Sequence, residues 1–129
     1  MAALSSLVAG APAVHIGHFI TNTSTGTQAI TGVGFKPSWI IVTGAQTNAD
    51  AAALSSVNGY YDGTTYYTHG KTINTAATIY QSTGSKLYIV YDVSANENRG
   101  VISSFDADGF TINKELANNA LTIFYLVGR

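Results

Sequence analysis

Short apolar stretches alternate with turn signals at intervals of roughly ten residues along the chain, and no stretch keeps a helical period for long. The apolar stretches are rich in Val, Ile, Tyr and Phe, which favour strands, and the segments between them are rich in Gly, Asn, Asp, Ser and Thr. This pattern is typical of an all-β protein, and we predict an antiparallel β-sandwich of jelly-roll type. The predicted strands are residues 14–21, 28–31, 38–43, 72–80, 86–91, 101–105, 110–112 and 120–127.

The segment at residues 32–43 is the one around which we expect the sandwich to be organised. Gly32 and Gly34 permit a sharp corner, and Pro37 stands at the start of the strand, where a missing N–H does least harm. The run that follows at residues 39–42, Trp-Ile-Ile-Val, is apolar at consecutive positions. We therefore predict a strand that is buried on both faces.

Hairpin turns are indicated by dipeptides that tolerate positive φ angles. Asn58-Gly59 and Asp62-Gly63 are of this kind, and residues 106–109, Asp-Ala-Asp-Gly, place a glycine at the end of a tight turn between two apolar runs. The segments that we expect to lack strands are loops at residues 92–100 and 115–119, and at most one short helix at residues 51–54.

Residues 1–13 differ from the rest of the chain because they are mostly small, uncharged and without a clear period. Such a segment cannot hold itself in place, because ordering a backbone costs about 1–2 kcal/mol per residue. We therefore predict an N-terminal arm at residues 1–13, followed by one β-sandwich domain at residues 14–129. The arm is held either by a neighbouring chain, with Leu4, Leu7 and Val8 as its partner-binding residues, or by its own domain. No basic residue precedes the apolar part, so we do not expect a secretory signal.

The composition limits the partners of the chain. Charged residues make up 10% of its 129 residues, against a usual share of about 25%, so we expect partners or copies of the chain to cover much of the surface. The formal net charge of −1 and the six scattered Lys and Arg residues argue against a nucleic-acid partner. No run approaches the roughly 18 apolar residues of a membrane span, so we expect no membrane partner. With no cysteine, neither a disulfide nor a thiolate metal site can form.

The sequence contains no recognisable catalytic motif, neither a nucleophile elbow of the Gly-x-Ser-x-Gly type nor a phosphate-binding P-loop. His15 and His18 lie three residues apart, which on a strand points them to opposite faces, and His69 is distant. Asp106 and Asp108 resemble the start of a calcium loop, but the glutamate that would complete such a loop is missing. We therefore predict no enzymatic activity, no metal and no cofactor.

The best candidates for a functional surface are four tyrosines, Tyr60, Tyr61, Tyr66 and Tyr67, which flank the second hairpin turn. Adjacent residues on a strand face opposite ways, so we expect one tyrosine of each pair to enter the core. Two interpretations remain open for the tyrosines: core packing, or a contact surface for a partner protein or a sugar ring.

Two short sequence words carry a resemblance to known proteins. They are Ile-Thr-Gly-Val-Gly-Phe-Lys-Pro at residues 30–37 and Ser-Ser-Phe-Asp-Ala-Asp-Gly-Phe-Thr-Ile at residues 103–112, and an aromatic last strand follows them. With these words the chain resembles, over roughly residues 14–129, small β-rich virion domains of tailed bacteriophages, which occur as capsid decoration proteins and at tail-fibre tips. The first word and the aromatic last strand are also similar to H-type lectins, whose sugar-binding residues have no matching positions here.

The resemblance implies a bacteriophage capsid decoration (cement) protein, which binds the major capsid protein on the capsid exterior as a homotrimer and stabilises the head shell without catalysis. The alternative that it implies is a tail-fibre tip or a lectin-like receptor-binding domain. In that case the tyrosines and the loops at residues 58–65 and 92–99 would recognise a glycan on the host surface.

Overall fold

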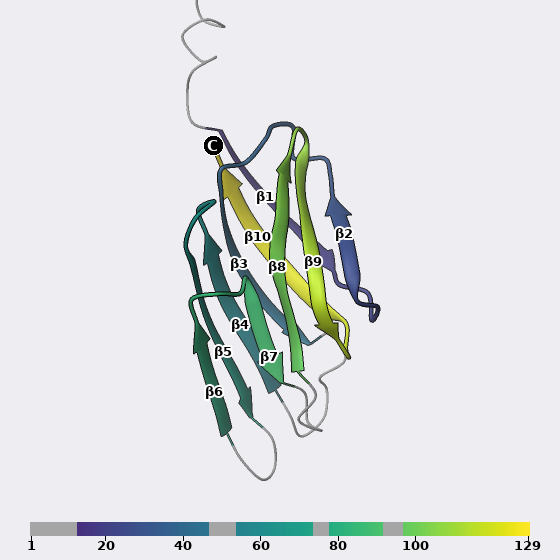
Figure 1. Ribbon diagram of the computed structural model, residues 1–129, viewed down its shortest axis with the longest axis vertical. Coiled ribbons are helices and arrows are strands. Elements are labelled where there is room, and N and C mark those ends of the chain that lie inside the picture. The colour runs from purple at the N-terminus through teal and green to yellow at the C-terminus, as the bar shows by residue number, and fades with distance from the viewer. Residues whose placement is uncertain (1–12, 47–53, 74–77, 92–96) are drawn as a thin grey trace, which may run out of the picture.

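The computed structural model describes residues 13–46, 54–73, 78–91 and 97–129, and it confirms the predicted antiparallel β-sandwich. A six-stranded sheet with the order β1-β10-β3-β4-β5-β6 packs on a four-stranded sheet with the order β2-β9-β8-β7 (Figure 1). Within the described ranges, no helix is long and apolar enough to cross a membrane. The strands are β1 (Val14–Ile20), β2 (Gly26–Ile30), β3 (Trp39–Gln46), β4 (Leu54–Tyr61), β5 (Tyr66–Ile73), β6 (Thr78–Thr83), β7 (Tyr88–Tyr91), β8 (Glu97–Asp106), β9 (Gly109–Ala117) and β10 (Leu121–Gly128).

The chain crosses repeatedly between the two sheets at one side of the sandwich. There β1, β10 and β3 lie next to each other in the six-stranded sheet, and β2 and β9 are neighbours in the four-stranded sheet. This interlocking of early and late strands is the part of the topology that matches a jelly roll. The other strands run as meanders, β3 to β6 in one sheet and β7 to β9 in the other, so the jelly-roll connectivity covers only one side of the sandwich.

Most predicted strands lie near their expected positions, and the turns expected at Asp62-Gly63 and at residues 106–109 are confirmed. Other polar segments were interpreted wrongly, because Asn58-Gly59, expected as a turn, lies within β4. The predicted strand at residues 72–80 is divided, because β5 ends at Ile73 and β6 begins at Thr78. Both predicted loops contain strand residues, because β8 begins at Glu97 and β9 continues to Ala117. These two strands pair with each other as one long hairpin, and a polar residue on the outer side of such a strand looks like a loop residue in a sequence. The expected helix at residues 51–54 lies outside the described residues, except for Leu54, which begins β4.

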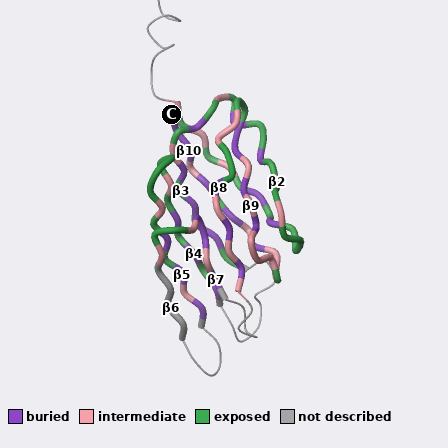
Figure 2. Tube along the Cα trace, viewed as in Figure 1, coloured by how far each residue is buried: buried purple, intermediate pink, exposed green. Residues whose placement is uncertain are grey.

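The prediction that β3 is buried on both faces is wrong. Ile40 and Val42 are fully buried, but Ile41 is 45% exposed, and Trp39 is partly exposed where its ring lies against Gly128. The reason is that β3 is central within its sheet, while only one side of that sheet is covered by the other sheet. The buried and exposed positions therefore alternate along the strand, as Figure 2 shows for the sandwich as a whole.

Aromatic side chains fill the core on the side where the chain crosses between the sheets. Phe110 of β9 meets Tyr125 of β10 edge to face, with ring centroids 5.0 Å apart, and Phe19 of β1 lies 6.0 Å from Phe110. Such rings bury large areas and favour this edge-to-face geometry. Large aromatic rings therefore fill the space between the two sheets on this side.

The two sheets approach each other much more closely where β7 crosses β4 and β5. A Cβ added at Gly59 of β4 would overlap the carbonyl oxygen of Leu87, which immediately precedes β7. The hydroxyl of Thr68 on β5 donates a hydrogen bond to the neighbouring carbonyl of Lys86. On this side of the sandwich, backbone packs directly on backbone, and Gly59 is needed because any side chain would force the sheets apart.

The glycine corner between β2 and β3 is held by the turn between β8 and β9. The carboxylate of Asp108 accepts hydrogen bonds from the backbone N–H groups of Gly32 (3.1 Å) and Gly34 (2.6 Å), and the Asp108 carbonyl accepts one from Val33. Both glycines have φ angles of +88°, a region that favours glycine, and this bends the N–H groups toward the carboxylate. The two sequence words that carry the family resemblance thus meet in space.

Candidate functional site

The outer face of the six-stranded sheet carries a continuous row of apolar side chains. In the register of the sheet, Ile16 lies opposite Leu126, and Leu126 lies opposite Ile41. Ile41 in turn lies opposite Tyr60, and Tyr60 lies opposite Tyr67. Opposed residues point to the same side of a sheet, so these five side chains form one line across β1, β10, β3, β4 and β5. The row is open to solvent, because Ile16 is 75% exposed and Tyr67 is 65% exposed.

Further exposed apolar side chains flank this row, namely Val14 and Ile20 on β1 and Phe124 on β10. We call the row and these three residues the apolar face. The ring of His18 lies beside Phe124, with centroids 5.7 Å apart. The face also contains a groove of about 200 Å³, which is lined by Ile16, Ile41, Thr43, Phe124, Tyr125 and Leu126.

The apolar face is almost free of charge. On β1, β3 and β10 the described outward positions carry no Asp, Glu, Lys or Arg. Monomeric soluble proteins rarely expose large contiguous apolar patches, and those that they do expose often bind a partner. A flat, uncharged, partly aromatic sheet face is suited to another protein surface rather than to an ionic ligand.

The four candidate tyrosines divide between the core and the surface, as the alternation of strand residues predicts. Tyr61 and Tyr66 point inward and stack on each other, with ring centroids 4.0 Å apart. The Tyr66 hydroxyl bridges the backbone of Ile102 in the other sheet, accepting from its N–H at 3.1 Å and donating to its carbonyl at 3.3 Å. Burial raises the pKa of Tyr66 to about 12. Tyr61 and Tyr66 are thus parts of the core, and only Tyr60 and Tyr67 are available as a contact surface.

Asp62 organises the turn between β4 and β5 at the end of the row. Its carboxylate accepts hydrogen bonds from the backbone N–H groups of Thr65 (2.7 Å) and Thr64 (3.0 Å), which lower its pKa. The Tyr60 hydroxyl donates to the other carboxylate oxygen at 3.3 Å. The turn therefore fixes one exposed tyrosine next to an ionised carboxylate.

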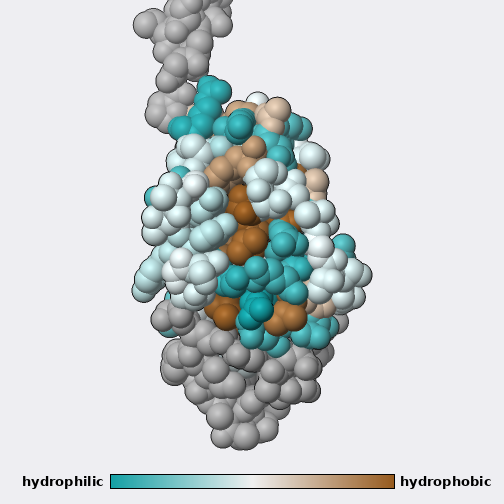
Figure 3. All heavy atoms as spheres, viewed as in Figure 1, coloured by the Kyte–Doolittle hydropathy of each residue, from teal (hydrophilic) through white to brown (hydrophobic). Residues whose placement is uncertain are grey.

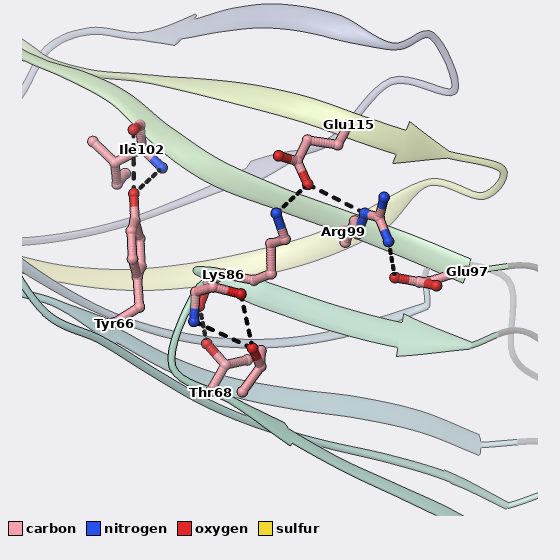
Figure 4. A network of polar contacts seen from close by, with 9 residues as sticks. Tyr66, Thr68, Lys86, Glu97, Arg99, Ile102 and Glu115 are labelled. Carbon is pink, nitrogen blue, oxygen red and sulfur yellow. Dashed lines mark hydrogen bonds and ion pairs between the residues drawn. The ribbon is translucent and has the colours of Figure 1, made fainter.

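The outer face of the four-stranded sheet carries an ion-pair network instead of an apolar row. Glu115 of β9 pairs with Lys86 at 2.6 Å and with Arg99 of β8 at 3.2 Å, and Arg99 also pairs with Glu97 at 3.0 Å (Figure 4). The two positive charges are thus balanced by two carboxylates of the same chain. Figure 3 shows this side of the molecule, where hydrophilic residues lie beside several apolar patches.

The predicted candidates for metal chemistry are not brought together within the described part of the chain, where no group of three His, Cys, Asp or Glu residues is placed to hold a metal ion. His15 lies beside Tyr125 on the inner side of β1, while His18 faces outward. Asp106 accepts hydrogen bonds from the hydroxyls of Ser104 and Thr111, which lower its pKa. The absence of a metal or cofactor remains a prediction.

Sequence reasoning missed Lys114, which lies inside the sandwich with only 2% of its surface exposed. It follows Phe110 and Ile112 on the inward side of β9, and burial lowers its pKa. Its ammonium forms no ion pair within the described residues. The only sequence signal for this position is the period of two that continues from the apolar residues before it.

The predicted arm residues Leu4, Leu7 and Val8 lie outside the described residues. The role of the arm in binding a partner therefore stays a prediction, and so does the place of residues 92–96 in a glycan site.

No protein-family model matches the chain, and no curated protein matches its sequence. Among solved structures, the tailspike protein of Acinetobacter phage vB_ApiP_P1 is similar, with a TM-score of 0.37 and 8% sequence identity. The match covers 88% of this chain and 21% of the tailspike chain, so this chain spans about a fifth of the length of that protein. The function proposed below therefore rests on the surfaces of the chain itself.

Proposed function

We propose that this chain is a non-enzymatic virion protein of a tailed bacteriophage that decorates the capsid exterior, where the apolar face binds the major capsid protein. The observation that carries the proposal is the apolar row from Ile16 to Tyr67, which crosses five neighbouring strands without interruption by a charged side chain. A cement protein needs a large complementary surface and no reaction centre, and stable interfaces of this kind are more apolar than transient ones.

A further observation supports this function. The words at residues 30–37 and 103–112, which resemble decoration and fibre-tip domains, form one structural unit through Asp108 and the glycine corner.

The proposal is tested by titrating the purified protein onto undecorated capsids of the phage that encodes it. We expect Ile41→Lys, which places a charge in the centre of the row, to weaken binding at least about tenfold, equivalent to about 1.4 kcal/mol. Thr27→Lys is the matched control, because it adds the same charge at an exposed position of β2 in the other sheet. Equal binding by both variants would show that the apolar face is not the contact surface.

The copy number in purified virions provides a second test. A decoration protein is present in near-stoichiometric ratio to the major capsid protein, whereas a fibre-tip protein is present in a handful of copies per particle. Quantitative mass spectrometry of purified virions therefore separates the two functions.

A receptor-binding function is the second candidate. It is favoured by the exposed Tyr67, which lies opposite Tyr60 in the sheet, and the Tyr60 hydroxyl contacts the ionised Asp62. An aromatic ring next to a hydrogen-bond acceptor can contact the apolar and hydroxyl parts of a sugar. A glycan array that detects specific binding, lost in Tyr67→Ala, would support this candidate over capsid decoration. Tyr66 is unsuitable for this test, because its substitution would disturb the core.

A further inference from the structure

Strand β1 forms one edge of the six-stranded sheet and pairs only with β10. Two backbone hydrogen bonds show which of its residues face β10: Thr21 N–H donates to Leu121 C=O at 2.9 Å, and Arg129 N–H donates to Ala13 C=O at 3.2 Å. The register between these positions is unbroken, and the direction of backbone groups alternates along a strand. The even-numbered residues, from Val14 to Ile20, therefore direct their N–H and C=O groups toward the open edge.

One end of this edge is already occupied. The side-chain amide of Gln28, on β2, donates a hydrogen bond to the carbonyl of Ile20 at 2.9 Å. Within the described residues, no comparable contact covers the outward backbone groups of Val14, Ile16 or His18. The free part of the edge therefore runs from Val14 to His18, and Ile16 is at its centre.

The free edge lacks the features by which proteins usually prevent sheets from joining. Such features are lysine or proline on the edge, a β-bulge or a very short strand. Strand β1 has seven residues, no charged residue and no proline, and its register with β10 has no bulge. By contrast, the edge strands of the four-stranded sheet are shorter, with five residues in β2 and four in β7.

The geometry points to antiparallel pairing of β1 with β1 of a second copy of this chain, about a two-fold axis at Ile16. In this register Ile16 lies opposite Ile16 of the second copy, and Val14 lies opposite His18. In each opposed pair, both residues direct their N–H and C=O groups toward the open edge. These groups can therefore form hydrogen bonds with each other across the contact. Ile16, the most exposed apolar side chain of the strand, also meets its own copy in the second chain, and no like charges are brought together.

This pairing has a consequence for the apolar face. A two-fold axis perpendicular to the sheet keeps both outer faces on the same side, so the two apolar faces become one continuous surface. The contact uses the edge and leaves the face free, so it does not depend on the proposed function. A two-fold contact of this kind closes after two chains, which distinguishes it from the homotrimer expected from the sequence.

The test is the mass of the protein in solution, measured by light scattering coupled to size exclusion over a range of concentrations. We expect wild type at twice the chain mass of 13.5 kDa, and His18→Pro at the single-chain mass. Proline at position 18 removes an N–H that points to the open edge, and edge strands tolerate proline in that orientation. His18→Ala is the matched control, because it loses the same ring but keeps the N–H, and we expect it to remain at twice the chain mass.

Amide exchange in the wild-type protein gives a second measurement that needs no variant. The amides of Val14, Ile16 and His18 are expected to exchange slowly at high concentration and to exchange faster on dilution. A single-chain mass at all concentrations, fast exchange of these amides throughout, or a His18→Pro protein that stays at twice the chain mass would each overturn the inference. Loss of the dimer in Ile41→Lys together with its survival in His18→Pro would assign the contact to the apolar face instead.

Discussion

The outer face of the six-stranded sheet carries exposed apolar side chains in one line, whereas the outer face of the four-stranded sheet carries charges that neutralise each other. On the first face, Ile16, Ile41 and Tyr67 have no cover within the described chain. On the second face, Lys86 and Arg99 both meet the carboxylate of Glu115. The charges of the four-stranded face are therefore neutralised within the chain. Covering the apolar face of the six-stranded sheet with another surface would lower the free energy, because apolar side chains would leave water.

The fold itself does not require this difference. Both sheets bury their inner sides in the same core, and the outer side of an antiparallel sheet commonly carries polar residues. The exposed apolar row is thus a property of the surface that the architecture leaves free to vary, and this is the reason for placing the function there.

The largest effect is expected in the layer that both faces share. Phe110 is fully buried against Tyr125 and Phe19, so Phe110→Ala should lower the free energy of unfolding by about 3–5 kcal/mol. Trp39→Ala should cost less, because that ring is partly exposed on the outer face. Chemical denaturation of both variants checks this order. An equal loss for Trp39→Ala would contradict the assignment of one side of β3 to the surface.

The next effect concerns whether the apolar face binds alone or together with the arm. Deletion of residues 1–12 should weaken capsid binding by about tenfold, or 1.4 kcal/mol, and leave the melting temperature unchanged. Ala13 is retained in this variant because its carbonyl pairs with Arg129. Capsid titration and thermal melting of the truncated and full-length proteins are the measurements. A lower melting temperature with unchanged binding would mean that the arm packs on its own domain.

Acid is expected to weaken the turns that aspartate carboxylates hold. Hydrogen bonds lower the pKa values of Asp62, Asp106 and Asp108 in the folded state relative to the unfolded state. Their contribution to stability is therefore complete above the unfolded pKa of about 4 and is lost as the pH falls through the lower folded values. The melting temperature should fall below about pH 4, and more shallowly in Asp108→Asn than in wild type. Identical pH profiles for the two proteins would contradict the role of Asp108 at the glycine corner.

The smallest effect is expected on the four-stranded face. Glu115→Gln removes two ion pairs that are partly exposed, and such pairs contribute less than about 1 kcal/mol each. Urea denaturation should show a small loss of stability that shrinks at high salt, with unchanged capsid binding. Reduced capsid binding in this variant would mean that the charged face, rather than the apolar face, contacts the capsid.

The sequence was sufficient to predict the strands that have a strong apolar pattern, and it predicted that the tyrosine pairs would split between core and surface. It was insufficient for β8 and β9, where Glu97, Arg99 and Glu115 lie on the outer side of regular strands and were assigned to loops. It was also insufficient for Ile41, because four apolar residues in a row do not reveal which side of a sheet will be covered.

The apolar row could not be predicted from the sequence at all. Its members come from strands that are far apart in the chain, and Ile16 meets Leu126 only because the first and last strands pair. Which residues share a line across a sheet depends on the register between strands, and a shift of one residue would turn every side chain to the other face. Pattern analysis of single segments contains no information on that register.

The position of β10 between β1 and β3 determines when the protein can finish folding. Strand β10 follows β1 and β3 by many residues in the sequence but lies between them in the six-stranded sheet, as Figure 1 shows, so β1 and β3 cannot belong to one sheet before β10 has been made. During synthesis both strands expose unpaired edges, and contacts between such distant segments form slowly. A chain without β10 would lose the connection between β1 and the rest of the sheet, so deletion of residues 121–128 should yield insoluble protein.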